Sequence, residues 1–158
     1  MKMMRSVCLA FTIAAVAGCA THGGGASPAH GMKALQSPHS VRMTVDRLEA
    51  AAKARGFSIF ARVDHSAGAQ KVGKALRPTE LLIFGNPQGG TPLMECAQTI
   101  GIELPLKALA WQDAGGAVWL AYNEPRYLLH RHGGGECQPA ADNVAHALEA
   151  LAAEAIKH

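Results

Sequence analysis

The fold is decided by residues 106–122, which read LKALAWQDAGGAVWLAY. Two apolar runs, 106–112 and 117–122, flank the turn-forming stretch Asp113-Ala114-Gly115-Gly116. Apolar runs joined by a short glycine-containing turn predict an antiparallel β-hairpin. Because an isolated hairpin is barely stable in water, the rest of the chain has to supply further strands and a layer that covers them.

Three more strands are predicted upstream of the hairpin. Residues 81–84 form a continuous apolar run that ends at Gly85-Asn86-Pro87, which favours a strand buried on both faces. Residues 57–64 alternate in the manner of a half-buried strand, and a short first strand is predicted over residues 40–43. The inward side chains of the strand at 57–64 are predicted to be Phe57, Ile59, Ala61 and Val63, with Phe60 as an exception.

Five helices are predicted from apolar spacing and from residues that favour helix ends. Thr44, Thr91 and Asn123 are expected as N-caps, and Asp64 or Ser66 is expected to cap the second helix. The predicted helices run from Thr44 to Arg55, from the Asp64 or Ser66 cap to near Leu76, from Thr91 to Gly101, from Glu124 to His132, and from Pro139 to Lys157.

This order of elements predicts an α+β fold. Strands and helices alternate up to the hairpin, and two helices follow it, the last being long and rich in alanine. We expect a two-layer sandwich in which helices cover one face of a curved, mostly antiparallel sheet. The folded domain is predicted over residues 39–158.

Residues 1–18 have the layout of a bacterial secretory signal peptide. Lys2 and Arg5 form a short basic start, and residues 7–16 are an apolar stretch. The sequence Val16-Ala17-Gly18-Cys19 resembles the lipobox of bacterial lipoprotein precursors, which implies that Cys19 is lipidated and that the chain is cut before it. The alternative is an ordinary signal peptide with a chance cysteine. Two acyl chains on one residue would give a stable membrane anchor.

The residues after the lipobox predict a tether and a location. Residues 19–38 are rich in Gly, Ala, Ser and Pro and lack a periodic apolar face, so we expect a lipidated cysteine followed by a flexible tether. Ala20 stands where an aspartate would hold a lipoprotein in the inner membrane, and this resembles outer-membrane sorting. The expected location is the bacterial cell envelope, on the outer membrane and facing the periplasm.

Composition and charge exclude several classes of protein. The 158 residues are 49% hydrophobic and 17% charged, which is enough apolar material for one core. No apolar run reaches the roughly 20 residues of a bilayer span, which excludes a polytopic membrane protein. After removal of the signal peptide, thirteen basic residues stand against twelve acidic ones, and this small excess gives no electrostatic footprint for nucleic acid.

Six short motifs follow one another within the predicted domain. They are Gly56-Phe57 with Ile59, Arg62-Val63-Asp64-His65, Leu81 to Pro87, Gly90 to Met94, Leu104 to Lys107, and Tyr122 to Pro125. In this order they resemble the bacterial and archaeal family called domain of unknown function 302, over about residues 40–133. The resemblance implies a small α+β domain with no assigned reaction. Cys96, Cys137 and the C-terminal helix are additional to its pattern.

The cysteines of the folded part predict a structural disulfide. Cys96 and Cys137 are the only two outside the signal region, and paired thiols are the rule for a small domain in an oxidising periplasm. A redox-active pair is disfavoured because no Cys-x-x-Cys spacing is present to lower a thiol pKa. Free or metal-bound thiols are the remaining alternative.

Histidines form the second candidate cluster. His65 follows a strand end, and His130 and His132 lie at the end of a short helix. Together with Cys96, Cys137 or Glu95 they could form a zinc or copper site, although no spacing typical of a zinc finger or metalloprotease exists. The alternative roles are a histidine favoured by the helix dipole for His132 and a capping or packing role for His65. The identity of any cofactor is left unknown.

A small-molecule pocket is the third candidate site. His65, Asn86, Tyr122 and Asn123 lie at strand ends, where polar groups beside apolar strands can line a cleft. The alternative is that Asn86 and Asn123 are turn and cap residues.

Three functions are compatible with these features. The first is an envelope lipoprotein with a non-enzymatic domain that binds a small molecule or an envelope protein. The second is a metal- or redox-linked periplasmic protein that uses the histidine and cysteine cluster. The third is a small hydrolase or isomerase with His65 as general base, which is disfavoured because the neighbouring Asp64 points to the opposite face if the strand continues.

Overall fold

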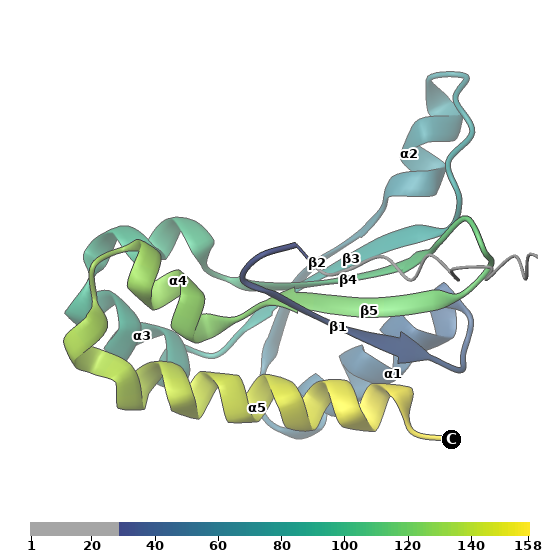
Figure 1. Ribbon diagram of the computed structural model, residues 1–158. Helices are drawn as coiled ribbons and strands as arrows, with labels where there is room; N and C mark the ends of the chain where they lie inside the picture. The colour runs from purple at the N-terminus through teal and green to yellow at the C-terminus, as the bar shows by residue number, and fades with distance from the viewer. Residues whose placement is uncertain (1–28) are drawn as a thin grey trace, which may run out of the picture.

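The computed structural model describes residues 29–158, and its sheet is fully antiparallel (Figure 1). The predictions for the signal peptide and for Cys19 lie outside the described residues. The strand order is β1-β5-β4-β3-β2. The strands are β1 (Met32–Ser37), β2 (Ser58–Asp64), β3 (Thr79–Gly85), β4 (Leu106–Gln112) and β5 (Val118–Asn123).

Helices α1 and α5 cover one face of this sheet, which confirms the predicted α+β fold with a long C-terminal helix (Figure 1). Helices α3 and α4 lie at one end of the sheet, and α2 projects from the other. No helix within residues 29–158 combines the length and apolar character needed to cross a bilayer. The helices are α1 (Val41–Ala54), α2 (His65–Lys71), α3 (Pro87–Cys96), α4 (Pro125–Arg131) and α5 (Gln138–Ile156), with 3-10 helices η1 (Gln98–Glu103) and η2 (Gly135–Cys137).

The predicted hairpin is strands β4 and β5, with Trp111 paired directly opposite Trp119. Asp113 holds the turn because its carboxylate accepts hydrogen bonds from the backbone N–H groups of Gly115 and Ala117, each at 2.9 Å. It also accepts a hydrogen bond from the indole N–H of Trp119, which lowers the pKa of Asp113. One side chain therefore holds both the turn and Trp119 of the tryptophan pair.

The predicted tether is wrong over Met32–Ser37, because these residues form strand β1. They pair with β5, for example Leu35 opposite Leu120. The predicted strand at 40–43 is also wrong. Ser40 is instead the N-cap of α1, and its hydroxyl oxygen accepts from the N–H of Met43 at 3.2 Å. Thr44, the predicted cap, is buried inside the helix.

Strand β2 contains a bulge that changes which side chains face inward. The register shifts between Ile59 and Ala61, with Phe60 as the extra residue. After the bulge, Ala61 and Val63 face away from the helices, contrary to the prediction, and Arg62 faces them. Arg62 hydrogen-bonds Glu80 on β3 and Asp46 on α1, so the inward position carries a paired charge.

Two further helix starts differ from the prediction, because the residue before a proline caps each of them. Asn86, and not Thr91, is the N-cap of α3, and Pro87 occupies the first turn. Glu124, and not Asn123, precedes Pro125 at the start of α4. Asp64 is confirmed as the cap of α2, since its carboxylate accepts from the N–H of Ala67.

Candidate functional site

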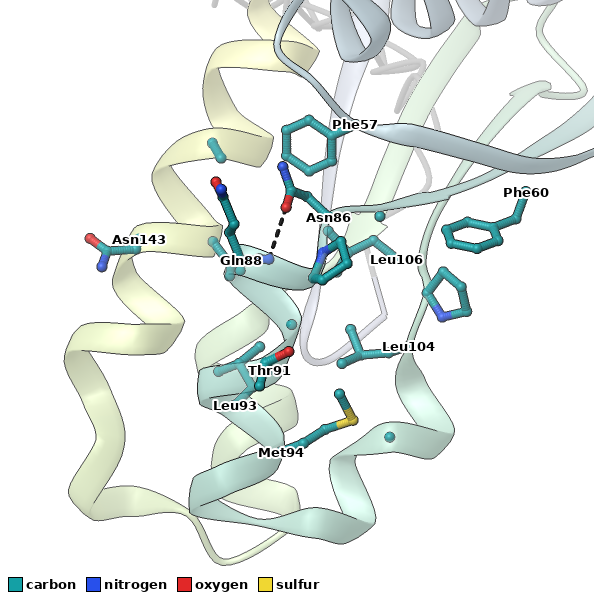
Figure 2. A pocket seen from close by; sticks show the side chains of 18 residues that line it. Phe57, Phe60, Asn86, Gln88, Thr91, Leu93, Met94, Leu104, Leu106 and Asn143 are labelled. Atoms are coloured by element: carbon teal, nitrogen blue, oxygen red, sulfur yellow. Dashed lines mark hydrogen bonds between the residues drawn. The ribbon is translucent and has the colours of Figure 1, made fainter.

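A cavity of about 500 Å³ lies where β3 ends and α3 begins (Figure 2). Its walls come from the first turns of α3, the start of β2, the end of β3, the segment after η1, and one side of α5. The aromatic and aliphatic lining residues are Phe57, Phe60, Leu93, Met94, Leu104, Leu106, Val144 and Ala147. Figure 2 shows Met94 of α3 and Leu104 pointing toward each other at one end of this space.

Glycines keep the cavity open. Gly85, Gly89, Gly90 and Gly101 all line it. A Cβ atom added at Gly90 would lie 3.3 Å from a methyl group of Leu104, and one at Gly89 would lie 3.4 Å from Val144. Two glycines in one turn of α3 also weaken the helix by roughly 1 kcal/mol each relative to alanine. Side chains at these two positions would enter the space and contact Leu104 or Val144, so the glycines help to keep the cavity open.

Asn86 fixes the N-terminal end of α3, as its N-cap. Its side-chain oxygen accepts a hydrogen bond from the N–H of Gln88 at 2.8 Å (Figure 2), and its amide nitrogen donates to the carbonyl of Gly56 at 3.2 Å. The N–H groups of Gly89 and Gly90 both donate to the Asn86 carbonyl. The first-turn donors of α3 are thus occupied, so this helix N-terminus has none of these groups free to bind an anion.

None of the 18 residues that line the cavity is titratable. The polar side chains among them are Asn86, Gln88, Thr91 and Asn143, and the last three are exposed. Acid–base catalysis requires a group that gains or loses a proton near the substrate. The lining can bind and orient a molecule, but it has no side chain for proton transfer.

The structure does not bring the four predicted pocket residues together. Asn86 lies in the cavity wall, but His65 lies at the opposite end of the sheet, because β2 runs antiparallel to β3 and Asp64 pairs with Glu80. Asn123 is exposed on β5, two strands away from β3. Of the four predicted pocket residues, Asn86 alone lines this cavity, and it does so as part of the wall.

Tyr122 is buried in the core, and its side chain is 3% exposed. Its hydroxyl group has no hydrogen-bond partner among residues 29–158. Burial, together with the carboxylates of Glu149 and Glu124, raises the pKa of Tyr122 to about 12. Tyr122 is thus a core residue with an unsatisfied polar atom and does not line the cavity.

The predicted metal site is not formed. His65 begins α2, whereas His130 and His132 lie at the end of α4 on the other side of the molecule. Within residues 29–158 no group of three or more His, Cys, Asp or Glu side chains is placed to hold a metal ion. The two cysteines are bonded to each other and are not available as ligands.

His132 has a packing role between helices. One ring nitrogen lies 3.0 Å from the hydroxyl of Thr99, and the other lies 3.4 Å from the carboxylate of Glu103, which also pairs with Arg131. These contacts join the end of α4 to η1, whose last residues lead into the cavity wall. The general-base prediction for His65 has no support either, because Asp64 binds Ser66 and Ala67 instead of His65.

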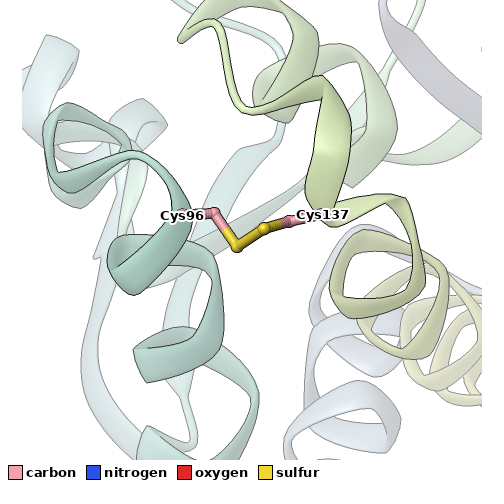
Figure 3. Close-up of a disulfide and its surroundings, with 2 residues drawn as sticks. All are labelled: Cys96 and Cys137. Carbon is pink, nitrogen blue, oxygen red and sulfur yellow. A yellow bond between two sulfur atoms is a disulfide. The ribbon is translucent and has the colours of Figure 1, made fainter.

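The predicted disulfide between Cys96 and Cys137 is confirmed (Figure 3). It joins the C-terminal end of α3 to the residue that precedes α5, with a Cα–Cα distance of 6.1 Å. Both cysteines pack against the core. The bond therefore ties together two of the helices that form the walls of the cavity.

Most of the cavity wall was missed because it consists of apolar and glycine residues. A signal was nevertheless present in the sequence. Four of the six motifs that carry the family resemblance contribute wall residues, namely those at 56–59, 81–87, 90–94 and 104–107. These stretches are far apart in the chain, and only the fold shows that they surround one space.

Comparisons with known proteins identify relatives and a fold. The chain is 53% identical over 102 residues to a fluoride-specific ion channel, FluC 1, of Brucella suis, and equally to FluC 2 of Brucella melitensis. The match covers 65% of this chain but only 40% and 38% of those proteins, so the chain spans about two fifths of their length.

A crystal structure supports the fold. An uncharacterized DUF302 protein of Bacillus stearothermophilus superposes with a TM-score of 0.73 at 20% identity, over 82% of this chain and all of that one. The family model described as domain of unknown function DUF302 matches residues 33–155, so it extends beyond the predicted residues 40–133 and includes the C-terminal helix, which was wrongly expected to be additional to the family pattern. The chain therefore belongs to the DUF302 family.

Proposed function

We propose that this chain is a bacterial envelope lipoprotein whose DUF302 domain binds a small, uncharged and largely apolar molecule. The observation that carries the proposal is the cavity of about 500 Å³ with apolar walls and no titratable lining residue. Small-molecule sites typically measure about 300–1,000 Å³ and have mostly apolar walls with a few polar groups.

The distribution of polar atoms supports an uncharged ligand. A charged group buried without a partner would be strongly destabilised, and the cavity wall contains no side chain of opposite charge to pair with it. Gln88, Thr91 and Asn143 are exposed lining residues and can hydrogen-bond a polar end of the ligand. The apolar remainder of the ligand would then contact Phe57, Met94 and their neighbours.

The glycines of α3 support a binding role because they lower the intrinsic stability of the helix and leave space that side chains would fill. Residues that destabilise their own helix or strand are expected at binding sites, where the site needs space or the ligand must approach the backbone closely. At Gly89 and Gly90 the space is the cavity itself. This argument favours a role for the cavity over an accidental gap in packing.

Two observations support location in the envelope. The sequence of residues 1–19 has the order of features of a lipoprotein precursor. The disulfide between Cys96 and Cys137 is of the kind that persists in an oxidising compartment. Since β1 begins at Met32, residues 20–31 would link the anchor to the domain and can span at most about 40 Å.

A fluorescent dye tests the cavity. The uncharged apolar probe N-phenyl-1-naphthylamine should bind the full chain with enhanced emission. Gly90→Leu places a side chain in the cavity beside Leu104 and should weaken dye binding at least tenfold. Gly68→Leu is the matched control, because Gly68 is also helical but has nothing within 4 Å of its added Cβ. Equal dye affinity in the two variants would refute the cavity as the binding site.

Detergent partitioning tests the anchor. The wild-type chain made in a bacterium should enter the detergent phase, and Cys19→Ala should remain in the aqueous phase. Cys8→Ala, which changes a cysteine in the apolar stretch, should partition like the wild type. A Cys19→Ala chain that still entered the detergent phase through an acyl group would rule out lipidation at this residue.

A second candidate function is an accessory role in fluoride handling, and the 53% identity to part of two fluoride-specific channels favours it. The cavity itself does not suit fluoride, since the first-turn donors of α3 are occupied and the wall contains no cation. Deletion of the gene should then increase growth inhibition by sodium fluoride but not by sodium chloride. Unchanged fluoride tolerance would exclude this role.

A further inference from the structure

The face of the sheet opposite α1 and α5 is apolar. Along β3 the inward residues Leu82 and Phe84 are fully buried, so their neighbours Leu81 and Ile83 point to the other side and are only partly covered. The same alternation places Leu109 and Trp111 of β4, and Trp119 of β5, on this side. We call this surface the open face; it consists of Ala34, Val63, Leu81, Ile83, Leu109, Trp111, Trp119 and Ala121, of which Ala121 is buried at 1% exposure and the others are partly accessible.

The strand register makes the open face continuous. Val63 lies opposite Leu81, Leu81 opposite Leu109, Leu109 opposite Ala121, and Ala121 opposite Ala34. One uninterrupted apolar row therefore crosses all five strands. A second row places the Trp111–Trp119 pair beside it. No helix within residues 29–158 lies across these rows (Figure 1).

The open face is also nearly free of charge. Within the described chain, Lys107 is the charged residue whose position in the alternation falls on this side. Its ammonium group donates to the backbone carbonyls of Glu103 and Pro105, at 2.8 and 3.1 Å, at the end of the strand. The carboxylate of Asp113 lies at the hairpin end of this face, where it accepts a hydrogen bond from the indole N–H of Trp119 at 2.8 Å. An apolar surface with few charges can pack against another copy of itself across a twofold axis.

Helix α2 and the loop after it form an arm on the same side as the open face (Figure 1). None of the α2 residues is buried. The following loop exposes two aliphatic side chains, Val72 at 72% and Leu76 at 49%. A helix of seven residues with no buried face gains little stability from its own chain. The arm is therefore a segment whose apolar residues have no partner within its own domain.

We propose that two copies of this chain pair through their open faces, sheet on sheet, with the α2 arm of each copy packed against the other. Five strands about 4.8 Å apart and about 20 Å long give roughly 500 Å² of sheet per copy. Two such faces total about 1,000 Å², near the lower limit of about 1,200 Å² for a stable interface, and the arms supply the remainder. A twofold axis would place the same residues on both sides of the interface.

Light scattering on the full chain in mild detergent tests the pairing. The protein mass, after subtraction of detergent, should be twice the 16.5 kDa of one chain or slightly less after processing. Leu109→Arg, in the centre of the apolar row, should halve this mass. Ile102→Arg is the matched control, because Ile102 is 79% exposed on η1 and does not lie on the open face. Circular dichroism checks that both variants fold.

Tryptophan fluorescence gives a second measurement, because Trp111 and Trp119 are the only tryptophans in the chain and both lie on the open face. Dilution of the wild type should shift the emission to longer wavelength and increase quenching by acrylamide as the pair separates. Leu109→Arg should show the separated spectrum at every concentration. Val72→Asp with Leu76→Asp should raise the concentration at which the shift occurs at least tenfold if the arm contributes.

Three outcomes would overturn the proposal. One is a wild-type chain that stays single at 100 µM with an unchanging tryptophan spectrum. Another is a pair that survives Leu109→Arg, which would place the contact elsewhere or in the shared micelle. The third is binding of the single Cys19→Ala chain to vesicles of anionic phospholipid that is lost in Leu109→Arg, which would identify a membrane surface as the occupant.

Discussion

The two faces of one sheet differ in how completely their side chains are covered. On the helix-covered face, Leu82, Phe84 and Leu120 are fully inaccessible to solvent. On the open face, Leu81 and Leu109 are built from the same strands yet stay partly accessible. Both faces are apolar, so amino-acid composition alone does not distinguish a buried core from an apolar surface that stays partly exposed in the single chain.

The polar groups of the two faces differ as well. The covered face includes Ser37, whose hydroxyl lies 2.7 Å from that of Thr44, and Glu80, which binds Arg62. These partners come from helix α1 and from neighbouring strands, and they make burial of polar atoms tolerable. The polar groups of the open face that have partners find them at its edges, where Trp119 donates to Asp113 and Lys107 donates to backbone carbonyls, so the centre can be covered by an apolar surface of similar size.

Removal of the disulfide should lower the free energy of unfolding more than any other change considered. The disulfide joins α3 to the residue before α5, on the helix-covered side of the sheet, so the open face should not be affected. The double variant Cys96→Ala, Cys137→Ala releases a loop of about 42 residues, which in the chain-entropy model lowers the free energy of unfolding by about 4 kcal/mol. Denaturant unfolding followed by circular dichroism measures this loss. The tryptophan emission of the folded state should not change, because both indoles lie on the open face. A change in that emission would show that the two sides are coupled.

Adjacent leucines on β3 provide a direct comparison of the faces. Leu82→Ala opens a cavity in the closed core and should cost about 3 kcal/mol, whereas Leu81→Ala should cost about 1 kcal/mol in the single chain. Denaturant unfolding at low and high protein concentration measures both. At high concentration the cost of Leu81→Ala should rise if the open face pairs, and the cost of Leu82→Ala should not. Equal costs at low concentration would refute the distinction between the faces.

Two adjacent residues of β2 compare a charged side chain on the covered face with an apolar one on the open face. Arg62→Ala leaves the buried carboxylate of Glu80 without its guanidinium partner and should lower the free energy of unfolding by about 2 kcal/mol. Val63→Ala, on the open face, should cost roughly 0.5 kcal/mol. Thermal unfolding of the two variants at equal concentration makes the measurement. A double variant Arg62→Leu, Glu80→Leu should recover much of the loss, since it removes the uncompensated charge.

The sequence predicts the elements whose signals are local. The hairpin of β4 and β5 is predicted well because Asp113 and the glycines lie next to the apolar runs they join. Strand β1 was missed because MKALQS has no clear alternation, and its stability comes from pairing with the distant strand β5. The bulge at Phe60 was noticed as an exception, but its effect on the faces of Ala61 and Val63 depends on pairing with β3.

The site was less predictable than the fold. Asn86 is predicted because polar groups at the ends of apolar strands can line a cleft, and the alternative prediction of a cap also holds, since Asn86 is the N-cap of α3. His65 and Asn86 were grouped because both end strands, but strand direction separates them, and direction depends on the complete topology. The apolar wall residues look like ordinary core residues until α3 is placed beside Leu104.

A gain in stability, in contrast to the losses above, is expected at Tyr122 on the covered face. Tyr122→Phe removes a buried hydroxyl group that has no partner among residues 29–158, so the free energy of unfolding at pH 7 should rise by about 1 kcal/mol. Tyr127→Phe is the control, because Tyr127 is the other tyrosine and is partly exposed. A loss of more than 1 kcal/mol in Tyr122→Phe would mean that the hydroxyl has a partner such as an ordered water.

The same residue predicts a dependence on alkaline pH. The pKa of Tyr122 is about 12 in the folded chain and about 10 in an unfolded one, so the neutral phenol is favoured by folding. Its contribution is therefore fully present below pH 10 and is lost as the pH rises from 10 to 12, by roughly 2 kcal/mol. Tyr122→Phe should lack this loss, and Tyr127→Phe should retain it. Denaturant unfolding at pH 9 and pH 11 distinguishes the two, and identical slopes with pH would show that the phenol ionises without unfolding the covered face.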